Sequence, residues 1–307
     1  MTSTTDTPAR PAGRKTPFVR LRRQGRPAQA AGRGRRRWHV GFWLAVGWLV
    51  LIVLLAVLAN VLPIKGYATP NFGNVNQPPG LRWPEFLGTD NLGRSELSRL
   101  IYGARVSLAV GFLSVGIAFV VGTTLGVLAG YFRRATEAVI NVASDTLLAI
   151  PPLVLLLGIT VVLKPSLRNL VIGLAVLGTP TFARLAKANT QTMARREFVS
   201  ASVILGARPA RVLWRDIVPN VLLPVSAFGA ELIGVFIVAE ASLSFLGLGV
   251  PPPQPSWGGM IAAGYPNLST APYLTFVPVV ALFLTVFSFK IVGDRLRARF
   301  ELQEAKL

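Results

Sequence analysis

The chain has 307 residues, of which 52% are hydrophobic and only 15% are charged, and its mean hydropathy is +0.53. A soluble domain carries charge on about a quarter of its residues, so this composition indicates a membrane protein with several spans. The sequence has no cysteine, which excludes disulfides, thiolate nucleophiles and cysteine-ligated metals. The single histidine, His39, stands at the start of an apolar run and is assigned no chemistry.

The first 38 residues form a basic tail that we expect to be disordered. Much of the net charge of +19 lies here, Asp6 is the only acid, and Pro, Gly, Ala and Thr are frequent. Such a tail is typical of the cytoplasmic side of a membrane, where it also attracts anionic lipid. Nucleic-acid binding is not expected, because so much of the excess charge is concentrated in this tail.

Six apolar runs predict an all-α protein with about six transmembrane helices, since a bilayer core takes about 20 apolar residues per helix. The first helix is expected at 39–63, an extracytoplasmic segment with an interfacial helix at 64–104, and a five-helix core at 105–300. Residues 301–307 form a cytoplasmic C-terminal end. The five core spans are predicted, in chain order, at 106–131, 138–163, 169–187, 221–247 and 272–293.

Turn and proline signals refine this outline. Asp90 and Gly93 predict a turn before the second span. Pro151-Pro152 and Pro180 are expected to interrupt the third and fourth spans and to permit bending. Trp257, in a Pro-rich stretch after the fifth span, is expected to anchor the chain at the membrane interface.

Basic residues in the short loops predict the orientation. Arg133 and Arg134 follow the second span, several arginines follow the fourth, and Arg295 is the first of three arginines after the sixth. With six spans, all of these lie on the same side as the basic tail. The positive-inside rule then places both termini and the loop over 188–220 in the cytoplasm.

The loop over 188–220 contains two helix signals separated by a glycine, within "EFVSASVILGARPARVLWRDIVPN". Glu197 lies in the first turn of the first helix, where a negative charge suits the helix dipole. Gly206 is expected to end this helix in a left-handed cap, and Pro209 to open the second helix. One face of the first helix carries, at spacings i, i+3, i+4 and i+7, Phe198, Ala201, Ser202 and Leu205.

Small side chains on this face favour docking into another protein. Ala201 and Ser202 leave the face shallow, so the helix can sit deep in a groove. An amphipathic helix on the membrane surface is the alternative. That alternative accounts for Phe198 and Leu205, but not for the small residues or for the break between the two helices.

The loop resembles the cytoplasmic EAA loop of permease subunits in bacterial binding-protein-dependent ABC importers. The family pattern is Glu-Ala-Ala, three residues, Gly, and a Pro thirteen residues later; here it reads Ser200-Ala201-Ser202, Gly206 and Pro219. Ser200 replaces the glutamate, which leaves Glu197 as the alternative source of charge. From about residue 82 onward, further blocks such as "GTDNLGRSELSRLIYGARVSLAVG" and "EASLSFLGLGVPPPQPSWGGMI" are similar to the second permease subunit of dipeptide, oligopeptide and nickel importers.

The resemblance implies a type I ABC importer permease in the bacterial cytoplasmic membrane, forming half of a translocation pathway for di- or oligopeptides. A nickel complex is the alternative cargo. The implied partners are a paralogous permease in a heterodimer, one or two ABC ATPase subunits, an extracytoplasmic substrate-binding protein and membrane lipid. The residues implied in coupling to the ATPase are Glu197, Phe198, Ala201, Ser202, Leu205, Gly206, Ala207, Arg211 and Pro219.

The chain itself is not expected to be an enzyme. It lacks the G-x-x-x-x-G-K-[ST] phosphate loop, so ATP and magnesium are expected on partner ATPase subunits rather than here. No Cys/His metal spacing and no H-E-x-x-H or G-x-S-x-G motif occurs, so we expect no catalytic residue, cofactor or metal site in this chain.

Three acidic residues lie at predicted membrane depth, where ionisable groups are rare and often functional, and they are the candidates for the translocation pathway: Asp145, Glu231 and Glu240. Asp145 and Glu240 are well explained by hydrogen bonds between helices, and Glu231 either packs in this way or faces the pathway and attracts a peptide's ammonium group. A proton-coupled secondary transporter that uses these acids is a competing hypothesis, and no convincing inverted repeat supports it. A non-transporting anchor that uses the basic tail is a third.

Overall fold

The computed structural model describes residue 2 and residues 31–304 except 82 and 84, with the backbone alone at 31–39 and 300–304. Most of the tail expected to be disordered and the last residues of the chain therefore lie outside the described residues. The first helix begins at Ala31, eight residues before the expected start, so the end of that tail is helical.

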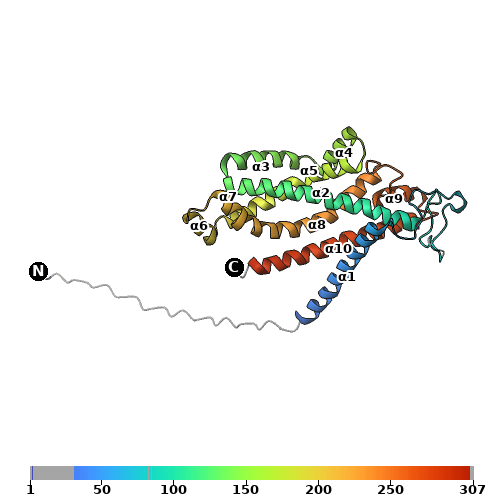
Figure 1. Cartoon of the computed structure of the whole chain (residues 1–307), viewed down its shortest axis with the longest axis horizontal. Coiled ribbons are helices and arrows are strands. Elements are labelled where there is room, and N and C mark those ends of the chain that lie inside the picture. The colour runs from blue at the N-terminus through green and yellow to red at the C-terminus, as the bar shows by residue number, and fades with distance from the viewer. Residues whose placement is uncertain (1, 3–30, 82, 84, 305–307) are drawn as a thin grey trace. The chain divides into compact units, whose positions relative to one another are not determined.

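Long helices dominate the described part of the chain (Figure 1). By length and composition the described residues contain five candidate membrane spans, or six if one bent pair of helices counts as a single span. This confirms an all-helical protein with about six spans. The long helices are α1 (Ala31–Leu58), α2 (Glu96–Phe132), α5 (Leu167–Met193), α8 (Val218–Phe245) and α10 (Tyr273–Glu304). The bent pair is α3 (Arg134–Ala149) and α4 (Pro152–Leu163). The short elements are η1 (Phe72–Asn74), α6 (Glu197–Ile204), α7 (Pro209–Arg211), η2 (Val212–Ile217), α9 (Trp257–Gly264) and η3 (Tyr265–Asn267).

Prolines explain why the third span is bent. The helices α3 and α4 meet at 88°, which confirms the interruption expected at Pro151-Pro152 within the span predicted over 138–163. Ile150 precedes Pro151 and has the extended φ and ψ of −85° and 129° that a following proline favours. Pro152 then starts α4, where its missing N–H costs nothing. Pro180 lies inside the continuous helix α5, so the expected interruption there is wrong.

The second span is longer than expected. The helix α2 begins at Glu96, with the Ser95 side chain accepting a hydrogen bond from the Ser98 N–H at 3.4 Å. Its 37 residues extend about 56 Å at 1.5 Å per residue, beyond a bilayer core of about 30 Å. The expected interfacial helix is therefore the first part of α2, and the boundary expected at residue 104 falls inside it.

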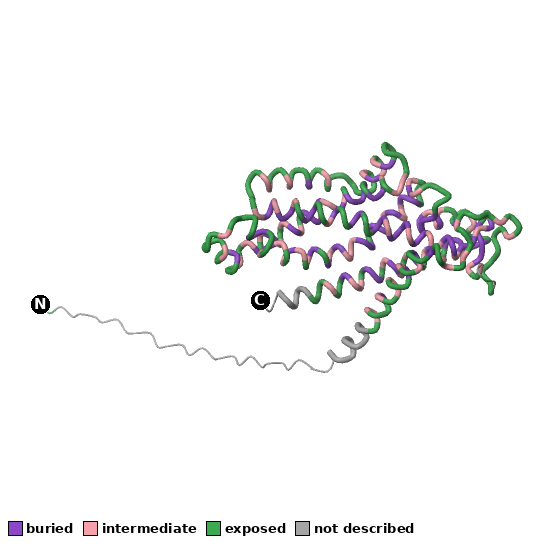
Figure 2. Tube along the Cα trace, viewed as in Figure 1, coloured by how far each residue is buried: buried purple, intermediate pink, exposed green. Residues whose placement is uncertain are grey.

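Glycines bring α2 and α5 into close contact. Gly122, Gly126 and Gly130 lie one turn apart along α2. A Cβ at Gly122 would lie 2.5 Å from the Thr179 carbonyl oxygen, and one at Gly126 would lie 2.3 Å from that of Ala183. Small residues at this spacing let two membrane helices approach backbone to backbone. Figure 2 shows the buried residues gathered along α2, α5 and α8, which form the core.

Trp257 belongs to this core rather than to the membrane interface, so the expected anchor is wrong. Its side chain is fully buried at the start of α9, and its indole N–H donates to the Leu100 carbonyl of α2 at 3.1 Å. The Trp257 backbone N–H donates to the Ser107 hydroxyl at 3.3 Å. These bonds join α9 to α2.

Candidate functional site

The short helix α6 is built as the sequence predicts. Glu197 opens it, and Arg196 at the N-cap makes no side-chain cap. Gly206 ends it with φ +83°, a left-handed conformation that favours glycine. The Gly206 N–H donates to the Val203 carbonyl at 3.0 Å, and the Ala207 N–H to that of Ser202 at 3.1 Å. This pair of bonds is the Schellman arrangement, which satisfies carbonyls at a helix end.

The expected docking face of α6 points away from the rest of the chain. Within the helix only Val199 is buried, and it attaches α6 to the core. Phe198 is half exposed, Ala201 is exposed, and Leu205 at the C-cap is 86% exposed. Ile204, which sequence reasoning missed, is 84% exposed. Figure 2 shows this end of the molecule as largely exposed.

After the turn that ends α6, a continuous helical path runs from Pro209 into the span α8. Pro209 opens α7 with Arg208 at its N-cap, and the path continues through the π-helix η2. Pro219 has no N–H for the Arg215 carbonyl, and its ring clashes with that carbonyl in a regular α-helix. The turn before it is widened, with the Val218 N–H bonded to the Leu213 carbonyl, five residues back. The π-turn at a proline is thus the join between α7 and α8.

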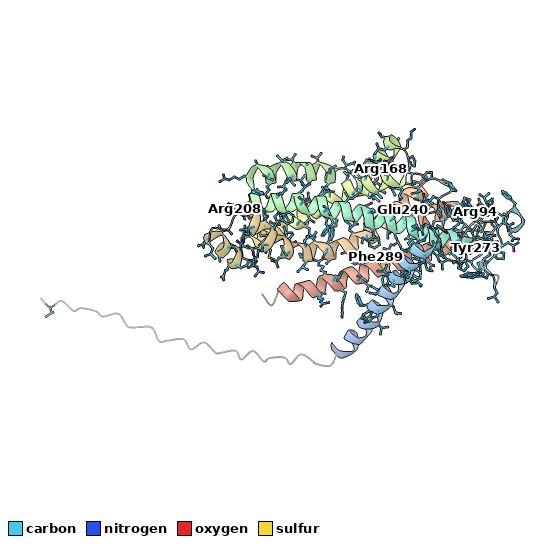
Figure 3. All side chains as sticks on the ribbon, viewed as in Figure 1. Arg94, Arg168, Arg208, Glu240, Tyr273 and Phe289 are labelled. Atoms are coloured by element: carbon cyan, nitrogen blue, oxygen red, sulfur yellow. The ribbon has the colours of Figure 1, made fainter. Side chains whose placement is uncertain are left out.

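The η2 helix divides its side chains sharply between core and surface. Val212 and Ile217 are fully buried, whereas Trp214 is 74% exposed. Sequence reasoning missed Trp214. The predicted residues Arg211 and Pro219 are exposed, and Ser202 and Ala207 are half-buried. Arg208, labelled in Figure 3, lies at the same end of the long helices as α6.

Glu240 is enclosed between helices. Its side chain is fully buried and accepts hydrogen bonds from the Ser107 hydroxyl of α2 at 2.9 Å and the Ser244 hydroxyl of α8 at 2.6 Å. The Ser256 hydroxyl donates to that of Ser244 at 3.2 Å. In this arrangement Glu240 joins helices and does not line an open pathway.

Glu231 is paired across helices. Its carboxylate accepts a hydrogen bond from Lys290 of α10, and Lys290 also lies 3.1 Å from Asp294. A peptide's ammonium group would have to displace Lys290 to reach Glu231. The geometry therefore favours the packing alternative for this residue.

Asp145 is different because its ion pair is exposed. Arg184 of α5 contacts it at 2.6 Å. The Arg184 side chain is 58% exposed and the Asp145 side chain is 63% exposed. A neighbouring pair on the same two helices, Lys187 and Glu137 at 2.9 Å, is 21% and 27% exposed. Asn141 also accepts from Lys187, at 2.9 Å. A polar stripe thus follows the contact between α3 and α5.

Comparison with known proteins assigns the chain to a family. Residues 122–302 match the family described as binding-protein-dependent transport system inner membrane component. The chain belongs to this family. It is 36% identical over 257 residues to the dipeptide transport system permease protein DppC of Alkalihalophilus pseudofirmus, covering 83% of this chain and 84% of the relative. It is 33% identical over 282 residues to the glutathione transport system permease protein GsiD of Pectobacterium atrosepticum, covering 92% and 93%.

Solved structures give the same fold. An inward-facing structure of the MetNI methionine ABC transporter matches with a TM-score of 0.52 and 21% identity, covering 66% of this chain and 97% of that chain. These findings confirm the resemblance of the sequence to an ABC importer permease with several membrane spans. The family match includes α6 and the bent pair. It begins within α2, so the segment that precedes α2 lies outside it.

That preceding segment of the permease is tightly cross-linked. The Asp90 carboxylate accepts from the backbone N–H groups of Leu92 and Arg94 at 2.9 and 2.8 Å and from the Arg94 Nε at 2.7 Å. The Gly93 N–H donates to the Asp90 carbonyl at 2.9 Å, which confirms the predicted turn. Tyr273 of α10 donates to the Thr89 carbonyl at 2.9 Å. We call residues 88–99 the outer cluster.

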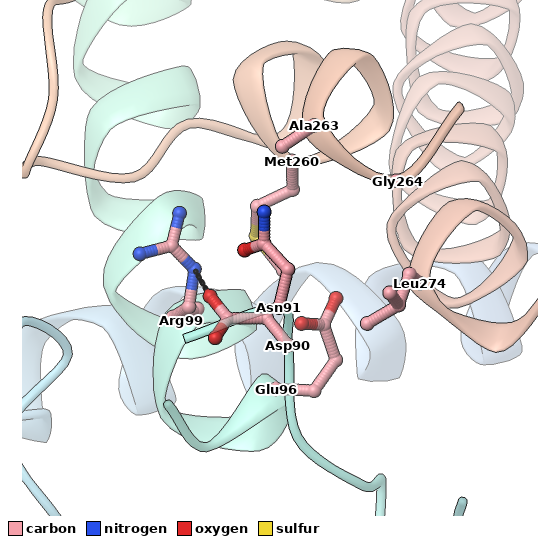
Figure 4. A pocket seen from close by; sticks show the side chains of 8 residues that line it. All are labelled: Asp90, Asn91, Glu96, Arg99, Met260, Ala263, Gly264 and Leu274. Atoms are coloured by element: carbon pink, nitrogen blue, oxygen red, sulfur yellow. Dashed lines mark ion pairs between the residues drawn. The ribbon is translucent and has the colours of Figure 1, made fainter. Parts of the chain in front are cut away.

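A small pocket lies beside the outer cluster, between the start of α2, α9 and α10 (Figure 4). Arg99 contacts Asp90 at 3.4 Å across it. Among the described residues, Glu96 Oε1 and Arg99 Nη1 are buried without a hydrogen-bond partner. Both side chains are more than nine-tenths buried, so these atoms are satisfied neither by the protein nor by free exposure to solvent.

Proposed function

We propose that this permease is the membrane subunit of an ATP-driven importer of di- or oligopeptides, and that it receives ATP-driven motion through residues 197–219, the coupling segment. The observation that carries the proposal is the exposed apolar face of α6, which Val199 attaches to the core and which a short turn joins to the helical path into the span α8. The relatives support the cargo, because one is a dipeptide permease and another a glutathione permease.

The exposed face requires a partner. Ile204, Leu205 and Trp214 present large apolar side chains that are each at least 74% exposed. Grouped exposure of this kind on a soluble surface marks an interaction site. A Cβ at Gly206 would have no neighbour within 4 Å, so the corner between the two helices is also open. These features fit a coupling helix seated in a cleft of an ATPase subunit.

Rigidity suits this segment to transmit motion. Val199 attaches α6 to the core, and Val212 and Ile217 attach η2. A displacement of α6 by a closing ATPase would therefore be carried into α8 rather than absorbed by a loose loop. The exposed Glu197 in the first turn of α6 is available for an ion pair with the ATPase, whereas Ser200, in the family's glutamate position, is not.

The remaining parts of the proposal follow from the family. A paralogous permease would complete the pathway in a heterodimer, one or two ATPase subunits would hold ATP and magnesium, and an extracytoplasmic binding protein would deliver the peptide. The coupling segment and both termini would lie in the cytoplasm, as the basic loops predict. The coupling residues are those expected from the sequence, with Ile204 and Trp214 added.

Co-purification tests the coupling. The tagged permease is solubilised from its native membrane in mild detergent, and accompanying proteins are identified by mass spectrometry. The same is done with residues 193–219 scrambled. We expect an ATPase with a phosphate loop that is lost on scrambling. A permease that purifies without any ATPase in both cases would contradict the proposal.

Uptake by the complete complex tests the cargo. Purified complex and binding protein are reconstituted in vesicles with ATP, and uptake of labelled dipeptides is compared with that of a nickel complex. We expect peptide uptake that requires ATP. Uptake of the nickel complex alone would favour the alternative cargo, and uptake driven by a proton gradient without ATPase subunits would favour a secondary transporter.

A further inference from the structure

The polar stripe between α3 and α5 contains two ion pairs that differ in exposure. Glu137 and Lys187 are largely covered, and Asn141 and Gln191 add hydrogen bonds to them at 2.9 and 3.2 Å. The second pair, Asp145 and Arg184, is more than half exposed on both sides. Among the described residues, Arg184 makes this contact through Nη2 alone, which leaves other guanidinium donors for a second partner.

The exposed pair lies within two candidate membrane spans. Arg184 is nine residues, or about 14 Å at 1.5 Å per residue, from the Met193 end of α5. Asp145 is eleven residues, or about 17 Å, from the Arg134 end of α3. Both helices belong to candidate spans. Charges at this depth are costly against lipid, so they face protein or a water-filled path.

The opposite face of α3 is the apolar one. Val139 is 69% exposed there and suits contact with lipid or with apolar protein, and Val142, 67% exposed, lies one turn before Asp145 at the margin of that face. The polar side of α3 therefore faces α5, with Asp145 at its open edge. The structure places an exposed pair of opposite charges on this edge, with the covered pair one turn away along α5 and two turns away along α3.

We propose that Asp145 and Arg184 are the charged contact of this permease with the peptide in transit. The Asp145 carboxylate accepts hydrogen bonds from the peptide's ammonium end, and the Arg184 guanidinium donates to its carboxylate end. The two residues give up their mutual contact for the charges of the peptide and re-form it when the peptide leaves. This inference rests on peptide import as proposed above.

Charge complementarity favours the peptide as the occupant. A free peptide carries both an ammonium and a carboxylate group, the two charges that this pair offers to bind. An exposed ion pair contributes little stability, so opening it costs little. The covered Glu137–Lys187 pair, with two additional hydrogen bonds, is not available for exchange in this way.

Opposite shifts in charge preference would distinguish substrate contact from a structural role. Asp145→Asn leaves Arg184 unpaired and positive, so it should slow a cationic dipeptide more than an anionic one. Arg184→Gln leaves Asp145 negative and should do the reverse. A merely structural pair would slow all peptides equally in both variants.

The experiment measures uptake of alanyl-alanine, lysyl-alanine and glutamyl-alanine by the reconstituted complex, as the ratio of variant to wild type for each peptide. This ratio cancels the preference of the binding protein, which is unchanged. We expect the ratio for each charged peptide to differ from that for alanyl-alanine by about fivefold, as for one unit charge at about 4 Å in water. The cationic and anionic peptides shift in opposite directions, and the directions are reversed between the two variants. Glu137→Gln and Lys187→Gln are the matched controls and should show no charge preference.

Equal ratios for all three peptides in both variants would overturn the inference, while peptide uptake by the wild type would leave the proposed function intact. A wild-type complex that imports no peptide would instead overturn the proposed function. If either variant fails to assemble, the inference is tested instead by whether water reaches this site. The chain has no cysteine, so Ala149→Cys, exposed one turn from Asp145 within the third predicted span, carries its only thiol. We expect it to react with a water-soluble maleimide, unlike Val50→Cys on α1; an unreactive thiol would overturn the inference.

Discussion

Gly93 and Gly206 lie at opposite ends of the long helices, and both have left-handed backbones, with φ of 72° and 83°. A Cβ at Gly93 would lie 1.8 Å from the Asn71 carbonyl oxygen, whereas one at Gly206 would have nothing within 4 Å. The same residue type therefore serves two needs. At the outer cluster glycine is required for internal packing, while in the coupling segment it is required only by its own backbone. One end is completed within the chain, and the other is left open for a partner.

Gly93→Ala should have the largest effect on stability. The new methyl group meets rigid backbone and also disfavours a positive φ, so we expect a loss of about 3 kcal/mol or more. The measurement is the thermal unfolding midpoint of the purified complex in detergent. Gly116→Ala is the control, because it lies within α2 with open space around it, and it should unfold at or slightly above the wild-type temperature. Equal midpoints for Gly93→Ala and wild type would contradict the packing argument.

Asp90→Asn should have the next largest effect. The amide keeps one acceptor for the backbone N–H groups of the turn, but it loses the charge that Arg94 and the buried Arg99 face. We expect a loss of about 2 to 3 kcal/mol in the same unfolding measurement. The control is Asp294→Asn, which removes an exposed contact with Lys290 and should cost less than about 1 kcal/mol. A variant with the full stability of the wild type would show that the outer cluster does not depend on this carboxylate.

The difference between the two ends also explains what the sequence could predict. Gly206, Pro209 and the turn at Asp90 were predictable because each depends on backbone chemistry within a few residues. The break at Pro151-Pro152 followed from the same rules, although the angle did not. Pro180 shows their limit, since α5 continues through it.

Contacts between distant residues could not be predicted in this way. Glu240 depends on Ser107, 133 residues away in the chain, and the burial of Trp257 depends on Leu100. The spacing of Gly122, Gly126 and Gly130 was a visible signal for the contact of α2 with α5, and it was missed. The apolar face of α6 was predicted in outline, but exposure was needed to add Ile204.

Gly206→Val should affect function more than stability. Valine is strained at φ +83°, at a cost of about 1 to 2 kcal/mol that is confined to an exposed corner. The displaced α6 should no longer fit its partner, so we expect membrane insertion to be retained and ATP-dependent uptake to be lost. Gly206→Asn is the matched control, because asparagine tolerates this conformation and should keep most of the activity. Normal uptake by the valine variant would count against the coupling role.

Ile204→Ser should have the smallest effect on stability and the clearest effect on the partner. The side chain is 84% exposed, so its removal should change the unfolding free energy by less than about 0.5 kcal/mol. If the ATPase buries it, the loss of about 1.5 to 3 kcal/mol of apolar burial should weaken binding roughly tenfold or more. Ala210→Ser, an exposed small residue of α7, is the control and should bind as the wild type does. Binding is measured by titrating detergent-purified permease with its ATPase. An unchanged affinity for Ile204→Ser would mean that the ATPase does not cover this face. The exposure of the coupling segment would then need another explanation.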